Sequence, residues 1–367
     1  MEHRKLGSFS EMKYGRMPDK KKLLDKGKYP VFSGYRIVGY YDECNIDKQE
    51  LIVVARGVGG TGDVKLSPGA CFLTNLSIAV IVNESIALKE YLYYYFQINN
   101  LRYLDSGSAQ SQITIADLKN VVVPIPPLDQ QRKVVEILSR YDEKIEVNNK
   151  INDNLQQQAL AIFQQELLRD GELPEGWSSG SLLDIANYLN GLAMQKYRPA
   201  DGENGLPVLK IKELRQGSCD ASSELCSPSI KPEYIVHDGD VIFSWSGSLL
   251  VDLWCGGTCG LNQHLFKVTS EKYPKWFYYA WTAHHLARFV AIAADKATTM
   301  DHIKREELAK AEVVIPDAAS MERIGGILQP IYDLIISNRI ENRKLATLRD
   351  TILPQLMSGE IDVRDPT

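Results

Sequence analysis

The segment Gly57-Val-Gly59-Gly-Thr-Gly62 has the G-x-G-x-x-G spacing of some nucleotide-binding loops. Such loops follow a strand and begin a helix whose N-terminal amides bind the pyrophosphate. The residues before the glycines, Glu50 to Ala55, read as a buried strand, but Pro68 and Gly69 break any helix that starts here. Asp63 also stands where a Walker A loop needs lysine. These residues therefore favour a flexible hairpin over a nucleotide site.

Other residue types with catalytic or metal-binding potential lack the necessary partners. The six cysteines contain no C-x-x-C pair, and Cys255 with Cys259 supplies only two of the ligands that zinc needs. We therefore predict reduced, mostly buried thiols. The chain has no H-E-x-x-H or [ND]-P-P-[FYW] motif, which argues against metalloprotease and amino-methyltransferase chemistry. His284 and His285 follow an aromatic segment and are predicted to be packing or surface residues.

Two short polar loops offer a different chemistry. Ser106 to Gln112 precedes Ile113, and Lys296 to His302 precedes Ile303, which lies 190 positions later (303 − 113). Hydroxyl and amide side chains can bond phosphates or base edges, and glutamine suits adenine. By composition alone, plain polar loops are an equally good interpretation.

The elements around these loops are also repeated. Asn148 and Asn152 recur as Asn338 and Asn342 at the same offset of 190 (338 − 148 and 342 − 152), and each pair lies in a heptad-spaced apolar stripe. A period of this size indicates a duplicated domain rather than a solenoid. One polypeptide would then have near two-fold symmetry, which suits a task that needs two similar heads at a fixed distance.

Further matches extend the repeat into the globular regions. Strands are predicted within 50–55, 70–82 and 121–124, with a tyrosine-rich helix over 88–101. The second copy supplies 240–245, 260–268, 274–294 and 311–316 in the same roles. The offset falls to 187 between Asn75 and Asn262, and to 176 between 6–9 and 182–185, so the second copy has extra residues near its front.

Each copy is predicted to end in a long helix. The first runs from about Leu128 to about Arg169 and stops at Gly171, while the second runs from about Ala318 to 354–359. Pro330 is expected to kink or restart the second helix and to make it the shorter of the two. An amphipathic helix of this length needs a partner, and the other long helix of the same chain could supply it, with the paired asparagines fixing the register between the two. The alternative is two separate helices, each packed on its own domain.

Composition adds weaker constraints. The chain has 367 residues, 44% of them hydrophobic, and no apolar stretch that reads as a signal peptide or membrane span, so we expect a soluble, cytoplasmic protein. Its net charge is −5, yet residues 1–30 hold nine basic and four acidic residues. DNA binding requires local rather than total positive charge. The lysine run 20–22 is interpreted either as a phosphate contact or as a solvated face.

Four segments resemble one known family. They are the helix entry Pro124-Ile-Pro-Pro-Leu-Asp-Gln-Gln-Arg-Lys-Val-Val-Glu-Ile-Leu138, the loop Gly107-Ser-Ala-Gln110, the segment Leu173-Pro-Glu-Gly-Trp177 and the C-terminal Leu353-Pro-Gln-Leu-Met-Ser-Gly-Glu-Ile361. In these segments the chain resembles the specificity subunit of type I restriction-modification enzymes. The globular parts match only in outline, and Gly191-Leu-Ala-Met-Gln-Lys-Tyr197 departs from the usual opening of the second half.

The resemblance implies an α+β fold of two target-recognition domains joined by two long helices in an antiparallel coiled coil. The expected domains are recognition domain 1 (1–126), the central helix (127–170), recognition domain 2 (171–316) and the C-terminal helix (317–367). It implies a non-catalytic subunit that reads a split sequence in double-stranded DNA. Two methyltransferase subunits would carry S-adenosylmethionine for adenine N6 methylation, and restriction subunits would use ATP and Mg²⁺. No metal or cofactor is expected in this chain.

Residue chemistry and loop position then suggest which side chains contact DNA. In the first copy they are Lys20, Lys21, Tyr35, Arg36, Arg56, Ser108, Gln110 and Gln112, and in the second Lys196, Tyr197, Lys210, Lys212, Trp245, Gln263, His264, Thr298 and Thr299. Two other functions remain open at this point: an S-adenosylmethionine-dependent methyltransferase, and a DNA-binding or coiled-coil scaffold that acts alone.

Overall fold

The computed structural model describes residues 2–57, 60–105, 111–168, 171–295 and 303–363. The chain forms two compact units, Met1–Glu143 with Ala346–Thr367, and Lys144–Leu345. The boundary between them falls inside both long helices. Each unit therefore contains one globular copy together with a part of each long helix, so the units cut across the four domains predicted from the sequence.

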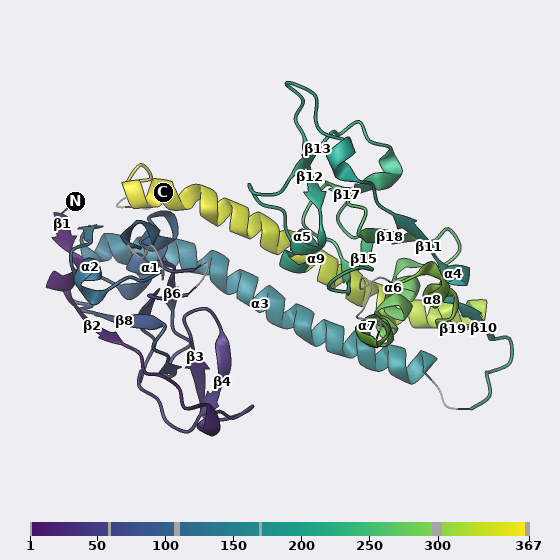
Figure 1. Ribbon diagram of the computed structural model, residues 1–367, viewed down its shortest axis with the longest axis horizontal. Helices are drawn as coiled ribbons and strands as arrows, with labels where there is room; N and C mark the ends of the chain where they lie inside the picture. Colours follow the sequence, from purple (N-terminus) through teal and green to yellow (C-terminus); the bar gives the residue numbers. More distant parts are fainter. Residues whose placement is uncertain (1, 58–59, 106–110, 169–170, 296–302, 364–367) are drawn as a thin grey trace. The chain divides into compact units, whose positions relative to one another are not determined.

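The first unit contains a mixed α/β domain (Figure 1). Its strands are β1 (Glu2–Lys5), β2 (Ser10–Tyr14), β3 (Tyr29–Phe32), β4 (Ile37–Tyr41), β5 (Leu51–Val54), β6 (Val64–Leu66), β7 (Phe72–Leu73), β8 (Ser77–Val82) and β9 (Val122–Ile125). Its shorter helices are η1 (Leu6–Ser8), η2 (Lys20–Lys22), α1 (Lys89–Ile98), η3 (Arg102–Leu104) and α2 (Ile115–Lys119). Because β5 is apolar and wholly buried, it forms the centre of the domain.

The second unit contains a domain built in the same way. Its strands are β10 (Ser178–Ser181), β11 (Asn187–Asn190), β12 (Leu206–Leu209), β13 (Leu225–Cys226), β14 (Ile235–Val236), β15 (Val241–Ser244), β16 (Leu250–Leu253), β17 (Cys259–Leu261), β18 (Leu265–Thr269) and β19 (Glu312–Ile315). Its shorter helices are α4 (Leu182–Ile185), η4 (Met194–Lys196), α5 (Ile211–Gln216), η5 (Pro232–Tyr234), α6 (Lys275–His284), α7 (Leu286–Asp295) and α8 (Arg305–Ala309).

Sheet topology confirms the predicted duplication. The four-stranded antiparallel sheets have the orders β2-β8-β5-β6 and β11-β18-β15-β16, which are the same order in the two copies. A second small sheet in each copy contains one parallel pair, β3 with β7 and β12 with β17. A two-stranded sheet, β1-β9 or β10-β19, lies next to the start of each long helix in the sequence.

The main offset of the repeat also holds for individual hydrogen bonds. The backbone N–H of Ile113 donates to the carbonyl of Ala55 at 2.9 Å, and its counterpart Ile303 donates to Trp245 at 3.0 Å. Both isoleucines are buried. The two polar loops therefore rejoin the domain at equivalent points, directly beside the ends of the equivalent strands β5 and β15.

The smaller offset near the front is confirmed in the same way. Leu6 donates to the carbonyl of Val121 at 2.8 Å, and Leu182 donates to that of Ala311 at 3.1 Å. The donors differ by 176 positions (182 − 6), whereas the acceptors keep the offset of 190 (311 − 121). The second copy therefore has its extra residues between Leu182 and Ala311, at the surface loops around β12 and β13.

The long helices are α3 (Leu128–Leu167) and α9 (Ala318–Ser358), with 40 and 41 residues. The expectation that Pro330 restarts α9 or makes it the shorter helix is wrong. Proline removes one helical hydrogen bond, but Leu328, Tyr332 and Ile335 on either side of it are buried in the core of the second unit. Tertiary packing therefore outweighs the local cost of proline.

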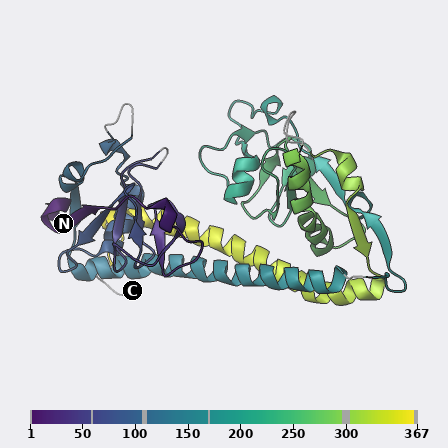
Figure 2. The ribbon, with the colours of Figure 1, turned by 60° about the horizontal axis from the view of Figure 1, so that its bottom comes forward.

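The two helices pair antiparallel, as predicted. In the second unit Ala159 and Phe163 of α3 share a core with Ile324 and Leu328 of α9. In the first unit Leu138 of α3 packs in the same cluster as the C-terminal turns of α9. Figures 1 and 2 show the two helices side by side. Among the described residues, no helix has the length and apolarity to cross a membrane.

The glycine-rich segment lies in a hairpin, as predicted. Strands β5 and β6 pair antiparallel on either side of it, so no helix starts at the glycines. Gly57 has a φ of +130°, and a Cβ there would lie 2.4 Å from the hydroxyl of Tyr35. Val58 and Gly59 lie outside the described residues. Glycine is therefore favoured at position 57 chiefly because other residues rarely adopt this positive φ.

Candidate nucleic-acid interface

In the first copy, four of the predicted residues lie near one end of the domain. The Tyr35 hydroxyl donates to the carbonyl of Arg56 at 3.1 Å, and Arg56 forms an isolated β-bridge with Gln112. Arg36 is exposed and lies in the same turn as Tyr35, with its N–H 3.2 Å from the Ser33 hydroxyl. The β5–β6 hairpin, the β3–β4 turn and the loop before α2 therefore converge here.

Arg56 is the most distinctive of these residues. Its guanidinium carbon lies 5.9 Å from the centre of the Tyr14 ring, and its buried Nε has no hydrogen-bond partner. It forms no ion pair with any residue that the structure describes. A guanidinium is a rigid donor fork that matches phosphate or the O6 and N7 of guanine. The Tyr14 ring thus positions Arg56, and the guanidinium N–H groups are available to bind a ligand.

Lys20 and Lys21 lie apart from this cluster. They are exposed on η2, where the Asp19 side chain accepts from the Lys21 N–H at 3.0 Å. The carbonyl of Asp19 accepts from the hydroxyl of Tyr41, at the end of β4 that is farthest from Arg36. These lysines therefore present a separate basic surface, which suits a backbone phosphate better than a base edge.

Several predicted contacts cannot be placed. Ser108, Gln110, Thr298 and Thr299 lie outside the described residues. Of the first polar loop, the structure describes Ser111 and Gln112. Gln112 is partly buried, and its backbone N–H donates to Asp105 at 2.9 Å.

In the second copy, the predicted residues surround a cavity of about 450 Å³. Four of its lining residues were predicted: Lys210, Lys212, Gln263 and His264. They come from the start of α5 and from the turn between β17 and β18, two segments that the parallel pairing of β12 with β17 brings together. The remaining lining residues are Met194, Gln195, Arg198, Ile211, Glu224 and Asn262.

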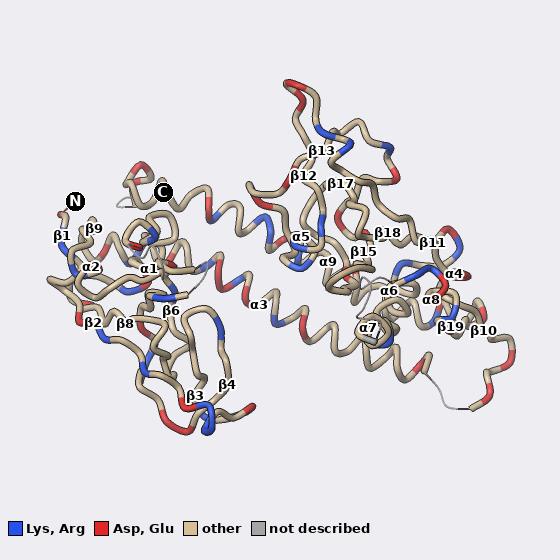
Figure 3. The backbone as a smooth tube through the Cα atoms, in the orientation of Figure 1, with Lys and Arg blue, Asp and Glu red and all other residues tan. Residues whose placement is uncertain are grey.

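The cations around this cavity are paired, unlike Arg56. Glu224 accepts from Lys210 at 2.5 Å and lies 3.1 Å from Arg198. The hydrogen bond from Lys210 holds the pKa of Glu224 below its usual value. Lys212 donates to Ser222 at 2.8 Å. Basic and acidic residues therefore alternate around α5 (Figure 3), and an incoming phosphate or base must compete with acidic groups for these donors.

Trp245, which was also predicted, does not line this cavity but lies near His264, which does. The Trp245 ring lies 6.4 Å from the His264 ring, and its indole N–H donates to Asn190 at 3.0 Å. His264 Nδ1 lies 3.1 Å from the Ser246 hydroxyl, and its Nε2 lies 3.3 Å from the Gln263 amide. This chain of hydrogen bonds fixes the imidazole and amide edges, as recognition of a base edge requires.

The sequence did not single out every residue of this cavity. Lys196 and Tyr197, which were predicted, are exposed beside it without lining it, whereas Arg198 and Gln195 line it. Glu224 was also missed. Proximity in the chain pointed to the right segment, but only the strand pairing of β12 with β13 places Glu224 near Lys210.

The four asparagines meet in the seam between α3 and α9. Asn148 Nδ2 donates to Asn342 Oδ1 at 2.8 Å, and Asn338 Nδ2 donates to Asn152 Oδ1 at 2.9 Å. Three of the four are buried. A slipped alignment would leave these amides unpaired in an apolar seam, so the pairs fix the register of the helices.

The second copy is attached to α9 by two arginines that directly follow these asparagines. Arg339 lies 2.7 Å from Asp252, and Arg343 donates to both carboxylate oxygens of Asp238 at 2.7 Å. The Arg343 bond holds the pKa of Asp238 below its usual value. The seam and the domain are thus fixed by neighbouring residues of one helix.

The first copy is attached differently. Asp142 of α3 accepts from the Tyr94 hydroxyl of α1 at 2.7 Å, and its other oxygen accepts from Arg349 of α9. One carboxylate therefore links the domain to both helices within the first unit.

Comparison with known proteins gives a consistent result. Residues 1–157 and 174–348 match the family model described as "Type I restriction modification DNA specificity domain". The two matched ranges correspond to the two copies seen in the fold.

Individual relatives and one solved structure agree with this match. The type I restriction enzyme MjaIX specificity subunit of Methanocaldococcus jannaschii is 25% identical over 88% of this chain and 81% of its own. The HindI specificity subunit of Haemophilus influenzae is 20% identical over 76% and 79%. The crystal structure of a type I S subunit from M. genitalium has a TM-score of 0.59 and 17% identity, covering 97% of this chain and 95% of that one, which supports the fold.

Proposed function

Because the chain belongs to the type I restriction-modification DNA specificity family, we propose that it selects a bipartite sequence in double-stranded DNA. Each copy would read one half of the sequence. Base-edge contacts would give the specificity, and Lys or Arg contacts to phosphates would position the protein.

The paired asparagines of the seam are the observation that carries this proposal. They lock α3 and α9 in one register, and each helix continues from one copy into the other unit. A fixed register makes the length of the helices a constant of the molecule. The number of unread base pairs between the half-sites would therefore follow from helix length.

The two half-sites would differ in sequence. The first copy offers an unpaired guanidinium, Arg56, beside a tyrosine, which favours guanine. The second copy offers the amide of Gln263 and the imidazole of His264. The nearby cation Lys210 already donates to Glu224. Amide side chains favour adenine. The duplicated scaffold would thus read an asymmetric target.

The chain would act as a non-catalytic subunit of a larger complex. We propose that two methyltransferase subunits bind it, carry S-adenosylmethionine and methylate adenine at N6, and that restriction subunits using ATP and Mg²⁺ join them. The near-symmetry of the two copies supports two copies of one partner. The net charge of −5 also supports a partner that completes the DNA clamp.

Methylation mapping tests this function. The chain and its methyltransferase subunit would be expressed in a host without adenine methylation, and modified adenines would be located genome-wide. We expect one bipartite motif with a constant spacer, and no methylation when either protein is omitted. A single contiguous motif, or methylation by either protein alone, would reject the proposal.

Salt dependence separates a DNA-binding subunit from a purely protein-binding scaffold. Binding of the complex to a target fragment should weaken steeply as salt rises from about 50 to about 200 mM, because phosphate contacts release counterions. A scaffold that does not contact DNA would leave the affinity of the methyltransferase for DNA unchanged.

A further inference from the structure

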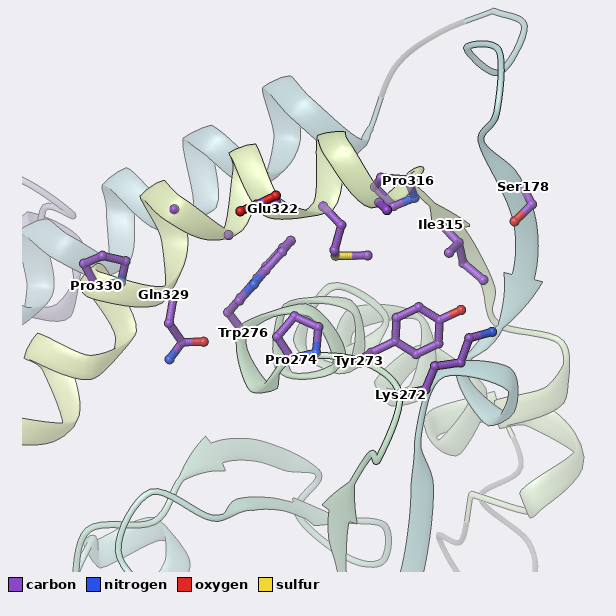
Figure 4. A pocket seen from close by; sticks show the side chains of 14 residues that line it. Ser178, Lys272, Tyr273, Pro274, Trp276, Ile315, Pro316, Glu322, Gln329 and Pro330 are labelled. Atoms are coloured by element: carbon purple, nitrogen blue, oxygen red, sulfur yellow. The ribbon is translucent and has the colours of Figure 1, made fainter.

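The second unit has two features that the candidate interface does not use. One is a groove of about 950 Å³ between the first turns of α9 and the segment that begins α6, with Trp276 and Met321 in its lining (Figure 4). No described residue identifies an occupant of this groove. The other feature is a pair of neighbouring cysteines, Cys219 and Cys259, whose thiols have a chemistry of their own.

The two cysteines come together from separate parts of the second domain. Cys219 lies two residues after Gly217, the C-cap of α5, and Cys259 is the first residue of β17. Both side chains belong to one hydrophobic cluster, together with Leu209 and Leu214. Within this cluster the Cys259 thiol donates a hydrogen bond to the Cys219 sulfur. The fold therefore makes neighbours of two thiols that are 40 positions apart in the sequence (259 − 219).

The environments of the two thiols differ. Cys219 is partly exposed, and the hydrogen bond from Cys259 lowers the pKa of its thiol. Cys259 is 1% exposed, and the same hydrogen bond, together with burial, raises the pKa of its thiol. An accessible thiol of lowered pKa is oxidised first, and a thiol beside it can resolve the sulfenic acid that forms. Cys219 thus has the properties of the attacking thiol, and Cys259 those of the resolving thiol.

The first copy provides a comparison. Cys71 occupies the place of Cys259, because each directly precedes the first residue of a parallel strand pair, β7 with β3 or β17 with β12. Burial raises the pKa of Cys71 to about 11, and Ser67 hydrogen-bonds its sulfur. The partly exposed Cys44 precedes Asn45, whose N–H donates to the Cys71 carbonyl at 3.2 Å. The first copy thus has cysteines at similar places, but a serine engages its buried thiol.

The cysteine pair of the second copy lies next to the cavity of the candidate interface. Cys219 begins a segment that holds a lysine of α5. In this segment Ser222 accepts from Lys212 at 2.8 Å, and Asp220 lies 3.6 Å from the same lysine. Cys259 begins β17, which leads to the turn that lines the same cavity. A covalent link between the two cysteines would keep this segment on the lysine that an incoming DNA phosphate needs.

We propose that Cys219 and Cys259 form a disulfide when the chain meets a hydroperoxide, and that this disulfide weakens DNA binding by the second copy. The effect on DNA rests on the function proposed above, whereas disulfide formation does not. The bond is transient, as is usual for disulfides of reducing compartments, because dithiols reverse it by exchange.

The oxidation proceeds in two steps. The Cys219 thiolate attacks one peroxide oxygen, the O–O bond breaks, and hydroxide leaves as Cys219 becomes a sulfenic acid. The Cys259 thiol then attacks the Cys219 sulfur. The S–O bond breaks, and the departing hydroxide takes the thiol proton as water. With hydrogen peroxide, two thiols are oxidised and one peroxide is reduced, so that one disulfide and two waters form.

Peptide mapping of the full-length chain under non-reducing conditions tests the modification. Hydrogen peroxide should link Cys219 to Cys259 in the wild type, and Cys219→Ser should form no such link. Cys44→Ser, the matched control in the first copy, should form the link as the wild type does. In Cys259→Ala, dimedone should trap the sulfenic acid on Cys219, which then has no resolving thiol. Absence of the link, or a link between any other pair of cysteines, would overturn the proposal.

Fluorescence anisotropy of the assembled complex tests the effect on DNA, with a duplex that carries the motif found by methylation mapping. Peroxide should weaken binding by the wild type about threefold or more, because Lys212 stays held, and dithiothreitol should restore it. The complex with Cys219→Ser should keep its affinity in peroxide. Equal weakening with Cys219→Ser, or full affinity of a chain with the disulfide in place, would overturn the regulatory effect.

The two measurements separate this inference from the proposed function. A reduced complex that shows no preference for a bipartite motif would reject the specificity function, and peptide mapping of the chain alone would still decide whether the disulfide forms. A chain that selects its motif but forms no disulfide would keep the specificity function and lose the redox site.

Discussion

The two copies share their scaffold but differ where they meet the long helices. In the second unit Arg339 and Arg343 hold the domain on α9, whereas the equivalent positions of α3 are Asn149 and Asp153. The first domain instead reaches both helices through Asp142. The sheets and the seam are thus common to both copies, while the contacts that orient each domain have diverged.

The same contrast appears at the surfaces proposed to contact DNA. Arg56 of the first copy has no acidic partner among the described residues, whereas Lys210 and Arg198 of the second share Glu224. A buried scaffold position is constrained by packing, but an exposed loop residue is not. One duplicated fold can therefore present two different readers.

The largest effect should come from a feature that the copies share. A Cβ at Gly15 would lie 2.1 Å from the carbonyl oxygen of Thr74, and one at Gly191 would lie 2.3 Å from that of Asn262. Gly15→Ala and Gly191→Ala should each lower the free energy of unfolding by about 3 kcal/mol, because backbone must move. Urea unfolding would measure this. Unequal losses would show that the two turns are not equivalent.

A smaller effect should distinguish the copies. Arg343→Ala removes a partly buried bidentate pair and should cost about 2 kcal/mol of unfolding free energy. Asp153→Ala, at the equivalent exposed position of α3, should change stability by less than about 0.5 kcal/mol. Equal effects in chemical unfolding would mean that Arg343 does not hold the second domain.

DNA binding should also be asymmetric. In the assembled complex, Arg56→Ala should weaken binding to the methylated motif about tenfold, since an unpaired guanidinium is lost. Lys210→Ala should weaken it only about threefold, because Glu224 already competes for this lysine. Fluorescence anisotropy at constant salt would compare them. The reverse ranking would contradict the proposed difference between the two readers.

A pH effect should arise at His285 in the second copy. Burial lowers the pKa of His285 below its usual 6.5, and its ring nitrogen lies 2.8 Å from the carbonyl of Glu312. The unfolded chain then binds this proton more tightly, so stability present above pH 6.5 is lost as the pH falls toward the folded pKa. The variant His285→Asn removes the titrating imidazole. It gives α6 the same C-cap residue that α1 has in the first copy, where Asn99 stands.

Urea midpoints at pH 7.5 and pH 5.5 would measure this pH effect. The wild type should lose more stability over this interval than His285→Asn. An identical loss in both proteins would assign the pH dependence to other groups.

The sequence was sufficient for the parts of the molecule that repeat. Asn148 and Asn338 mark the seam because an amide in an apolar stripe stands out, and the constant offset of the repeat identifies its counterpart. The continuity of α9 was misjudged, because the sequence shows the local cost of Pro330 but not the packing of Tyr332 and Ile335 that outweighs it.

The candidate interface was harder to predict. Lys210 and Gln263 were selected by chemistry, and the fold brings them to one cavity. Glu224 escaped because no local pattern fixes the register between β12 and β13. The DNA contacts themselves, including those at Ser108 and Thr298, remain predictions.

Changing helix length tests the central claim most directly. Four residues would be inserted between Glu143 and Asn148 of α3, and four between Asn342 and Arg349 of α9, so that the asparagine pairs stay matched. The insertion adds about 6 Å of rise and about 40° of rotation. DNA rises about 3.4 Å per base pair. Methylation mapping should therefore show unchanged half-sites and a spacer longer by about one to two base pairs. An unchanged spacer would contradict the claim that the paired helices set the distance between the two readers.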